Sequence, residues 1–183
     1  MSHAFHVNTI GHSTRPLQEF VELLQGHKVK RLIDVRTVPR SRHNPQYNRE
    51  TLPASLQNFN ISYSHFPGLG GLRPKHKQSI NMGWRNASFR AYADYMQTEE
   101  FSESLDGMLQ IAAQEQVALM CAEAVPWRCH RSLVADALLV RGIDAFEIIN
   151  PARSQLHKLT PFAQVQGTVI TYPTAEPSNG ELF

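Results

Sequence analysis

Five short apolar runs, separated by segments with helical periodicity, constrain the fold of this chain more than any other feature. The runs are residues 5–10, 31–35, 61–66, 117–121 and 144–149. Apolar strands that alternate with helices are typical of parallel sheets joined by right-handed crossovers. The run 117–121 is almost wholly apolar, which predicts a strand covered on both faces. We therefore expect an α/β fold: a single-domain three-layer sandwich with a mostly parallel sheet of about five strands flanked by helices.

The segments between these runs carry the apolar spacing of amphipathic helices. Residues 17–24 have apolar side chains at positions i, i+3, i+4 and i+7, which places one helix face on the core. Further helices are expected over 49–59, 88–115 and 132–141. The longest of them is expected to break near Thr98.

The 183 residues form one predicted domain, 1–183, because a chain of this length builds a single core. We take 5–150 as the core of the domain and 151–183 as a C-terminal extension, in which 168–172 is a possible edge strand. The start of the chain lacks the basic and apolar regions of a signal peptide. No apolar run reaches the roughly 18 residues of a membrane span. We therefore expect a cytoplasmic protein without a membrane partner.

Charge is distributed unevenly along the chain. The segment 35–93 contains nine Lys or Arg residues and one acidic residue, Glu50, and so has a net charge of +8. The remaining residues carry −6, which leaves an overall charge of only +2. A basic surface of this kind favours an anionic partner, either a phosphate-bearing small molecule or a nucleic acid. The alternative is a solvated basic surface without a ligand.

Two cysteines, Cys121 and Cys129, flank one loop, and two are too few for a disulfide scaffold. Cys129 is expected where a helix begins, beside His130 and near arginines, which lowers the pKa of a thiol. We therefore expect Cys129 to be the reactive thiol. His130 or His12 would be its proton partner, and Glu123 a general acid or base or an orienting carboxylate. The alternative is that both cysteines are small buried hydrophobic side chains.

Known cysteine motifs do not describe this loop. A phosphatase loop has Cys, five residues and then Arg, but Trp127 and Ala135 stand at the two positions where that Arg is required. No Cys-x-x-Cys pair occurs, which argues against a thioredoxin-like pair and a zinc ribbon. A metal site of non-standard spacing remains an alternative. Its ligands would be Cys121, Cys129 and His130, with Glu123 or His12.

Conspicuous polar residues follow the predicted strands directly. In a parallel sheet the carboxyl ends of the strands share one edge, where ligands bind. Gly11, His12 and Ser13 follow the first strand, and such a turn suits an anion; plain capping of the next helix by Ser13 is the alternative. Arg36 ends the second strand, and Asp34 is a possible ion-pair partner for it. The expected anion-binding residues are Gly11, Ser13, Arg36, Arg128 and Arg131.

Four motifs follow one another from about residue 5 to about residue 150. They are Thr9-Ile10-Gly11-His12-Ser13, Asp34-Val35-Arg36 with Pro39 and Ser41, Leu69-Gly70-Gly71, and Cys121-x-Glu123 followed by Cys129-His130-Arg131. The ordered set resembles the domain-of-unknown-function 488 family, and His157 resembles a histidine found late in such proteins. The resemblance implies a small α/β protein whose residues of interest lie in these motifs. It implies no particular reaction.

These observations favour an enzyme-like site at the carboxyl edge of the sheet, where a phosphate-bearing ligand lies next to a reactive cysteine. One alternative is a nucleic-acid-binding module without catalysis. It would use the basic loops 36–49 and 73–90 on phosphate backbones, and its binding would weaken steeply with salt. The other alternative is the Cys/His metal site. The sequence identifies neither a cofactor nor an oligomeric state.

Overall fold

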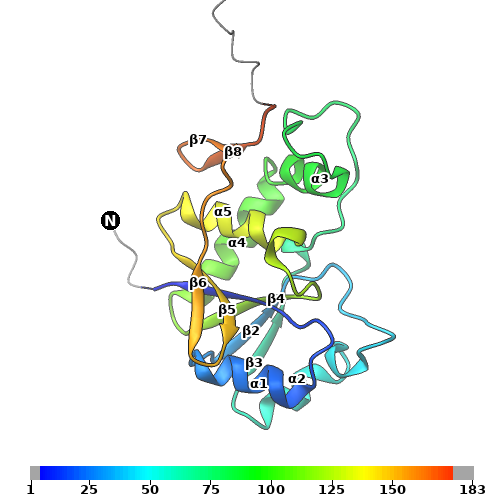
Figure 1. Cartoon of the computed structure of the whole chain (residues 1–183), viewed down its shortest axis with the longest axis vertical. Helices are drawn as coiled ribbons and strands as arrows, with labels where there is room; N and C mark the ends of the chain where they lie inside the picture. The colour runs from blue at the N-terminus through cyan, green and yellow to red at the C-terminus, as the bar shows by residue number, and fades with distance from the viewer. Residues whose placement is uncertain (1–4, 175–183) are drawn as a thin grey trace, which may run out of the picture.

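A six-stranded sheet is the centre of the computed structural model, which describes residues 5–174 (Figure 1). The strand order is β3-β2-β4-β1-β5-β6. The strands are β1 (Val7–Gly11), β2 (Arg31–Asp34), β3 (Ser62–His65), β4 (Val117–Cys121), β5 (Ala145–Asn150) and β6 (Arg153–Leu156). The pairs among β1 to β5 are parallel, and β6 is antiparallel to β5. The predicted α/β sandwich with a mostly parallel sheet is confirmed.

Residues of β4 alternate between two cores. Leu119 and Cys121 face one core, and Ala118 and Met120 face the other. The helices on the first face are α3 (Ala87–Tyr95), α4 (Glu99–Ala112) and α5 (Arg131–Leu139). Those on the second are α1 (Leu17–Gly26) and α2 (Leu52–Gln57). Figure 1 shows these two helix layers above and below the sheet. Both faces of β4 are therefore buried, which explains its continuous apolar sequence.

Helix ends follow local chemistry. The predicted break near Thr98 is confirmed, because α3 ends at Tyr95 and the Thr98 hydroxyl accepts a hydrogen bond from the Phe101 amide at 3.3 Å at the start of α4. A side chain of this type is a preferred N-cap. Helix α2 is shorter than the predicted 49–59. Capping of α1 by Ser13 is wrong, because Pro16 occupies the N-cap position and no side chain caps that helix.

The C-terminal extension differs from the expectation in two respects. The polar strand β6 was not anticipated, since its sequence Arg-Ser-Gln-Leu lacks an apolar run. The predicted edge strand at 168–172 forms as β8 (Val169–Thr171), but it pairs with β7 (Gln164–Gln166) in a separate hairpin. Buried Asp136 of α5 accepts hydrogen bonds from His157 Nε2 at 2.7 Å and the Tyr172 hydroxyl at 2.8 Å, and so ties this extension to the domain.

Three short 3-10 helices follow β2, β3 and β4. They are η1 (Pro45–Tyr47), η2 (Pro67–Leu69) and η3 (Pro126–Arg128), and each has a proline at its start. Proline is preorganised for that position, so these turns order the loops at the carboxyl edge of the sheet. In the part of the chain that the structure describes, no helix is long and apolar enough to cross a membrane. The start of the chain up to Ala4 and the end of the predicted tail, 175–183, lie outside the described residues.

Candidate functional site

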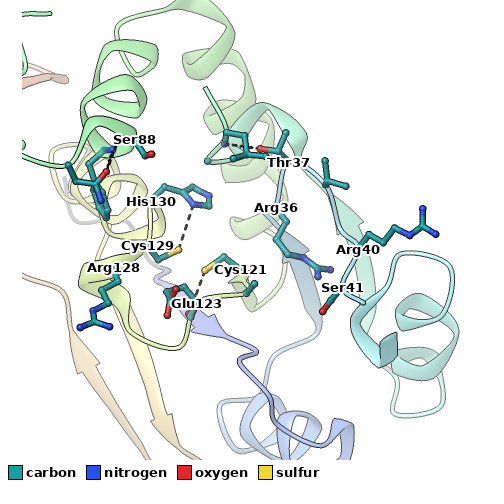
Figure 2. Close-up of a pocket in the computed structure, with 16 residues that line it drawn as sticks. Arg36, Thr37, Arg40, Ser41, Ser88, Cys121, Glu123, Arg128, Cys129 and His130 are labelled. Carbon is teal, nitrogen blue, oxygen red and sulfur yellow. Dashed lines mark hydrogen bonds between the residues drawn. The ribbon is translucent and has the colours of Figure 1, made fainter. Parts of the chain in front are cut away.

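A cavity of about 550 Å³ opens at the carboxyl ends of β2 and β4 (Figure 2). Four segments line it: the loop after β2, residues 71–72, residues 86–89 at the start of α3, and the loop 121–130 between β4 and α5. Five of the nine residues singled out in the sequence lie in this lining. They are Arg36, Glu123, Arg128, Cys129 and His130. The expected convergence on one edge therefore holds for these five.

Cys121 ends β4 and carries the more acidic thiol of the site. Arg131 Nη1 donates to Cys121 Sγ at 2.7 Å, and the Cys129 thiol also hydrogen-bonds to this sulfur. Burial disfavours the Cys121 thiolate, but the hydrogen bond from Cys129 and the charge of Arg131 outweigh it and lower its pKa to about 7. A substantial fraction of Cys121 is thus ionised at neutral pH.

The expectation of a lowered pKa at Cys129 is wrong. Its hydrogen bond to Cys121, together with burial, raises the pKa of Cys129 well above the usual value. The α5 amide of Arg131 does reach Cys129 Sγ, at 3.5 Å, as the helix-terminus argument required. A negative sulfur beside Cys129 nevertheless keeps the thiol proton in place, because two adjacent thiolates would repel each other. The acidic thiol is Cys121, and Cys129 is its neutral neighbour.

His130 is a neutral imidazole next to the thiol of Cys129. Its Nε2 atom donates to the Val35 carbonyl at 3.0 Å, and its Nδ1 atom lies 3.6 Å from Cys129 Sγ. Burial lowers the pKa of His130 to about 4, so the ring is uncharged at neutral pH. With Nε2 protonated, Nδ1 has a free lone pair that faces Cys129. The position fits the predicted role of His130 as proton partner, and that role stays a prediction.

Arg131 cannot serve the predicted role of binding an outside anion. A guanidinium has five N–H groups, and the protein accepts all five. The acceptors are Cys121 Sγ, the Glu123 carbonyl, the Ala124 carbonyl and both carboxylate oxygens of Glu147. The side chain is fully buried. Arg131 instead stabilises the thiolate and holds the loop that follows it.

Arg36 has most of its donors engaged but still contributes to the cavity. Its guanidinium donates to both oxygens of Asp34, to the Tyr47 carbonyl and to His12 Nε2. The possible pair with Asp34 is confirmed. Among the described residues one Nη1 hydrogen has no acceptor, and a cavity ligand could accept it.

His12 positions Arg36 and does not line the cavity. Its Nδ1 atom donates to the Ser13 carbonyl at 2.7 Å, and its ring stacks on Tyr47. Burial lowers the pKa of His12 to about 4, so Nε2 is free to accept from Arg36. His12 borders a separate hollow of about 250 Å³ that shares Ser41, Ala122 and Glu123 with the main cavity. The predicted role as proton partner of a cysteine has no supporting contact among the described residues.

The turn at Gly11 and Ser13 supports the loop after β4. The His12 and Ser13 amides donate to the carbonyls of Cys121 and Ala122 at 2.9 and 3.0 Å, so they are not free to hold an anion. A Cβ atom at Gly11 would lie 1.8 Å from the Glu123 carbonyl oxygen. Only glycine permits this approach of β1 to the loop.

Exposed groups at the rim were partly missed in the sequence. Arg128 and Glu123 were predicted as site residues. Arg40 was predicted only as part of the basic loop 36–49 and Ser41 only as part of a family motif, and Ser88 was not predicted. Figure 2 shows Arg40 and Arg128 on opposite sides of the two cysteines, with both guanidinium groups directed outward. Neither has an acidic partner within residues 5–174, whereas other arginines do. The basic composition of the loop after β2 was the available signal for Arg40; Ser88 carried none.

Taken together, the fold and the site define an α/β protein with two free cysteines in the lining of a cavity at the carboxyl edge of its sheet. A family model, Domain of unknown function DUF488, matches residues 16–138, about two thirds of the chain, and the chain belongs to that family. The resemblance of the motifs is thereby confirmed. Comparison with curated proteins and with solved structures found no match.

No group of three His, Cys, Asp or Glu side chains suited to a metal ion occurs within residues 5–174, so no geometry supports the metal alternative.

Proposed function

We propose that the protein binds a phosphate-bearing ligand in this cavity and holds it next to the Cys121 thiolate, which acts as the reactive group. One observation carries the proposal. The thiolate lies at the base of an open cavity whose rim bears two arginines, Arg40 and Arg128, without acidic partners among the described residues. Unpaired guanidinium groups around a concave site favour anions, and arginine matches phosphate oxygens in geometry.

The charges around the cavity support an anionic ligand. Arg131 and Glu147 neutralise each other, as do Arg36 and Asp34. Of the remaining charged groups, Arg40 and Arg128 balance the Glu123 carboxylate and the Cys121 thiolate, so the positive charge that a ligand can meet is confined to the two rim arginines. Hydroxyl groups of Ser41 and Ser88 border the same space and are suitable donors to phosphate oxygens.

The specific role of the thiolate is that of a nucleophile. The pKa of Cys121 is lowered to about 7, so part of it is the thiolate at neutral pH, and the thiolate is the reactive form of cysteine. Both cysteines are free and buried. A cytoplasmic location, which we also propose, would keep them reduced.

Alkylation of Cys121 tests the proposal without knowledge of the natural ligand. We expect anionic iodoacetate to modify Cys121 at least about threefold faster, relative to neutral iodoacetamide, than it modifies a free thiol, because the rim attracts anions. Inorganic phosphate and pyrophosphate should slow the modification by occupying the cavity. Pyrophosphate should be the stronger protectant, because it spans more of the two rim arginines.

Variants test whether the two rim arginines cause the preference for iodoacetate and the protection by pyrophosphate. In the double variant Arg40→Ala/Arg128→Ala, both the preference for iodoacetate and the protection by pyrophosphate should fall to the level of the free thiol. The matched control is Arg153→Ala, which removes an exposed arginine on β6 and should change neither. If pyrophosphate at millimolar concentration fails to protect Cys121 in the wild-type protein, the anion site is disproved.

A nucleic acid is the second candidate ligand, because six basic side chains of the segment 35–93 are exposed. They are Arg40, Arg42, Arg49, Lys75, Lys77 and Arg85. Such a module would bind an oligonucleotide with a steep salt dependence and would not depend on Cys121. The same alkylation assay distinguishes the two: protection by an oligothymidylate but not by pyrophosphate would favour this second function.

A further inference from the structure

The pair formed by Cys121 and Cys129 has chemistry that anion binding does not use. The two sulfur atoms are turned toward each other in the cavity (Figure 2), and each thiol shifts the pKa of the other. The chain places one sulfur at the end of β4 and the other just before α5. The two residues are eight positions apart, so the loop 122–130 folds back to bring the sulfurs to face each other.

We propose that hydrogen peroxide, or a hydroperoxide of similar size, oxidises Cys121 and that Cys129 then closes a Cys121–Cys129 disulfide. The site would thus be a reversible peroxide-responsive dithiol. This inference needs the thiolate of the proposed function but not its anionic ligand.

The first step is a two-electron transfer at Cys121. Its thiolate attacks one oxygen of the peroxide, an S–O bond forms, and the O–O bond breaks. The leaving hydroxide takes a proton from solvent and becomes water. Sulfur is oxidised to a sulfenic acid, and the peroxide is reduced. Arg131 Nη1, which contacts this sulfur at 2.7 Å, stabilises the attacking thiolate.

The second step is condensation of the two side chains. Cys129 sulfur attacks the sulfenic sulfur of Cys121, an S–S bond forms, and the S–O bond breaks with release of water. The proton of Cys129 has an acceptor at hand in His130 Nδ1, 3.6 Å from Cys129 Sγ. The Arg131 amide, 3.5 Å from the same sulfur, stabilises the charge that develops on it. A dithiol reductant reverses the reaction by thiol–disulfide exchange.

The side chains that contact each sulfur give the two cysteines different roles in the reaction. Cys121 has a guanidinium contact, and Cys129 has an imidazole contact without a cationic side chain bonded to its sulfur among the described residues. Cys121 is therefore the peroxide-reacting thiol, and Cys129 is the resolving thiol. Closing the disulfide removes the nucleophile of the proposed function until a reductant restores it.

The test treats the reduced full-length chain with hydrogen peroxide at about one to five equivalents near neutral pH. We expect denatured samples to lose both titratable thiols, and intact protein to lose the mass of two hydrogen atoms. Peptide mapping should find the Cys121–Cys129 crosslink, and dithiothreitol should restore both thiols. These measurements need no variant. Oxidation of Cys121 to sulfinic acid without a crosslink, or no reaction at these doses, would overturn the inference.

Two single variants separate the steps. Cys129→Ala should accumulate a sulfenic acid at Cys121, which dimedone traps as one adduct. Cys121→Ala should react with peroxide at least about tenfold more slowly, because the remaining thiol is not ionised. If Cys121→Ala reacts as fast as the wild-type protein, the assignment is wrong. Protection of Cys121 by pyrophosphate is measured on reduced protein, so failure of the disulfide and failure of the anion site give different results.

Discussion

Arg131 connects the reactive sulfur to the framework of the sheet. Its guanidinium contacts Cys121 Sγ on one side and Glu147 of β5 on the other, and Glu147 in turn accepts from the Thr9 hydroxyl of β1. Three adjacent strands therefore hold one arginine in place. A buried ion pair contributes little net stability, so we attribute its importance here to the fixed position of a positive charge beside the thiol.

Ionisation of Cys121 gives the first prediction. The rate of alkylation by iodoacetamide should rise with pH around a midpoint of about 7, since the Cys129 thiol and Arg131 together lower the pKa of Cys121 against its burial. The other charged or titratable groups are Arg36, Arg40, Glu123, Arg128 and His130 in the cavity lining and Glu147 behind Arg131. The measurement is the rate of adduct formation between pH 5.5 and 9 by mass spectrometry.

Removal of the thiol hydrogen bond is the matched test of this first prediction. In Cys129→Ala the midpoint should move upward by about one pH unit, because the thiolate loses a hydrogen-bond donor. The His130 ring has a pKa of about 4 and adds no second transition in this range. An unchanged midpoint would show that Cys129 does not stabilise the Cys121 thiolate.

Two buried histidines give the second prediction. Burial lowers the pKa of both His12 and His130 from 6.5 to about 4, so the unfolded chain takes up protons at a higher pH than the folded chain. Stability is therefore fully present above pH 6.5 and is lost as the pH falls toward 4. Between pH 7 and pH 5 each histidine should reduce the free energy of unfolding by about 2 kcal/mol.

Urea unfolding at these two pH values measures the loss. His12→Asn keeps a donor for the Ser13 carbonyl and should have a smaller loss between pH 7 and pH 5 than the wild type. His76→Asn changes an exposed side chain and serves as the control. Equal losses in His12→Asn and wild type would contradict a neutral, buried His12.

At the scale of single residues, the sequence indicates which side chains belong to the site better than it indicates what each of them does there. Arg131 and Arg36 stand out in the sequence as anion ligands because their charge is visible and their partners are not. Glu147 is sixteen positions from Arg131 along the chain, yet folding places its carboxylate 2.8 Å from the guanidinium. The identity of the acidic cysteine likewise depends on which sulfur the guanidinium reaches, and neighbouring residues in the sequence do not determine that contact.

At the scale of the elements, β1 and the loop 122–130 hold the cavity together. The loop hydrogen-bonds to the turn after β1 through the His12 and Ser13 amides, and Gly11 allows the backbones to meet. The position of Cys121 relative to the rim therefore depends on the contact between β1 and this loop.

Glycine substitution tests this contact and is the third prediction. Gly11→Ala should reduce the free energy of unfolding by roughly 1–3 kcal/mol, since the new methyl group would overlap the Glu123 carbonyl and backbone must move. It should also change the rate of Cys121 alkylation. Gly107→Ala is the matched control, because a Cβ atom in α4 would lie 3.7 Å from Phe66, an ordinary contact. That variant should be stabilised by roughly 0.5–1 kcal/mol. Equal effects of the two substitutions would contradict the close approach.

Elements with a strong period were predictable, and weakly patterned ones were not. Strand β4 and helix α1 follow from apolar spacing that a local stretch of chain already contains. Strand β6 is a polar edge strand. It forms by backbone pairing with β5, and its own sequence has no apolar pattern that predicts it. The strand order, in which β4 lies between β1 and β2, depends on long-range packing. The common edge was predictable without that order, because all parallel strands share it.

For the whole molecule, folding divides the basic segment into two groups. Arg36, Arg73 and Arg90 donate to groups of the protein itself. Of the six exposed basic residues of the segment only Arg40 lines the main cavity, together with Arg128 from outside the segment. Arg42, Arg49, Lys75, Lys77 and Arg85 are not part of its lining. The charge asymmetry of the sequence therefore overstates the charge available at the site.

The fourth prediction is that the basic residues outside the cavity do not contribute to pyrophosphate binding. It is measured by how far pyrophosphate slows the alkylation of Cys121. A quadruple variant that replaces Arg42, Arg49, Lys75 and Lys77 with alanine should keep the protection constant within about twofold, because charges beyond the cavity are screened over roughly 8–10 Å. Raising NaCl from about 50 to 200 mM should weaken protection by less than about tenfold, since few charges meet a compact ligand. A polyanion that engages six basic side chains would lose roughly 300-fold over the same range. Loss of pyrophosphate protection in the quadruple variant, or a salt dependence of that larger size, would place the binding surface on the basic loops and outside the cavity.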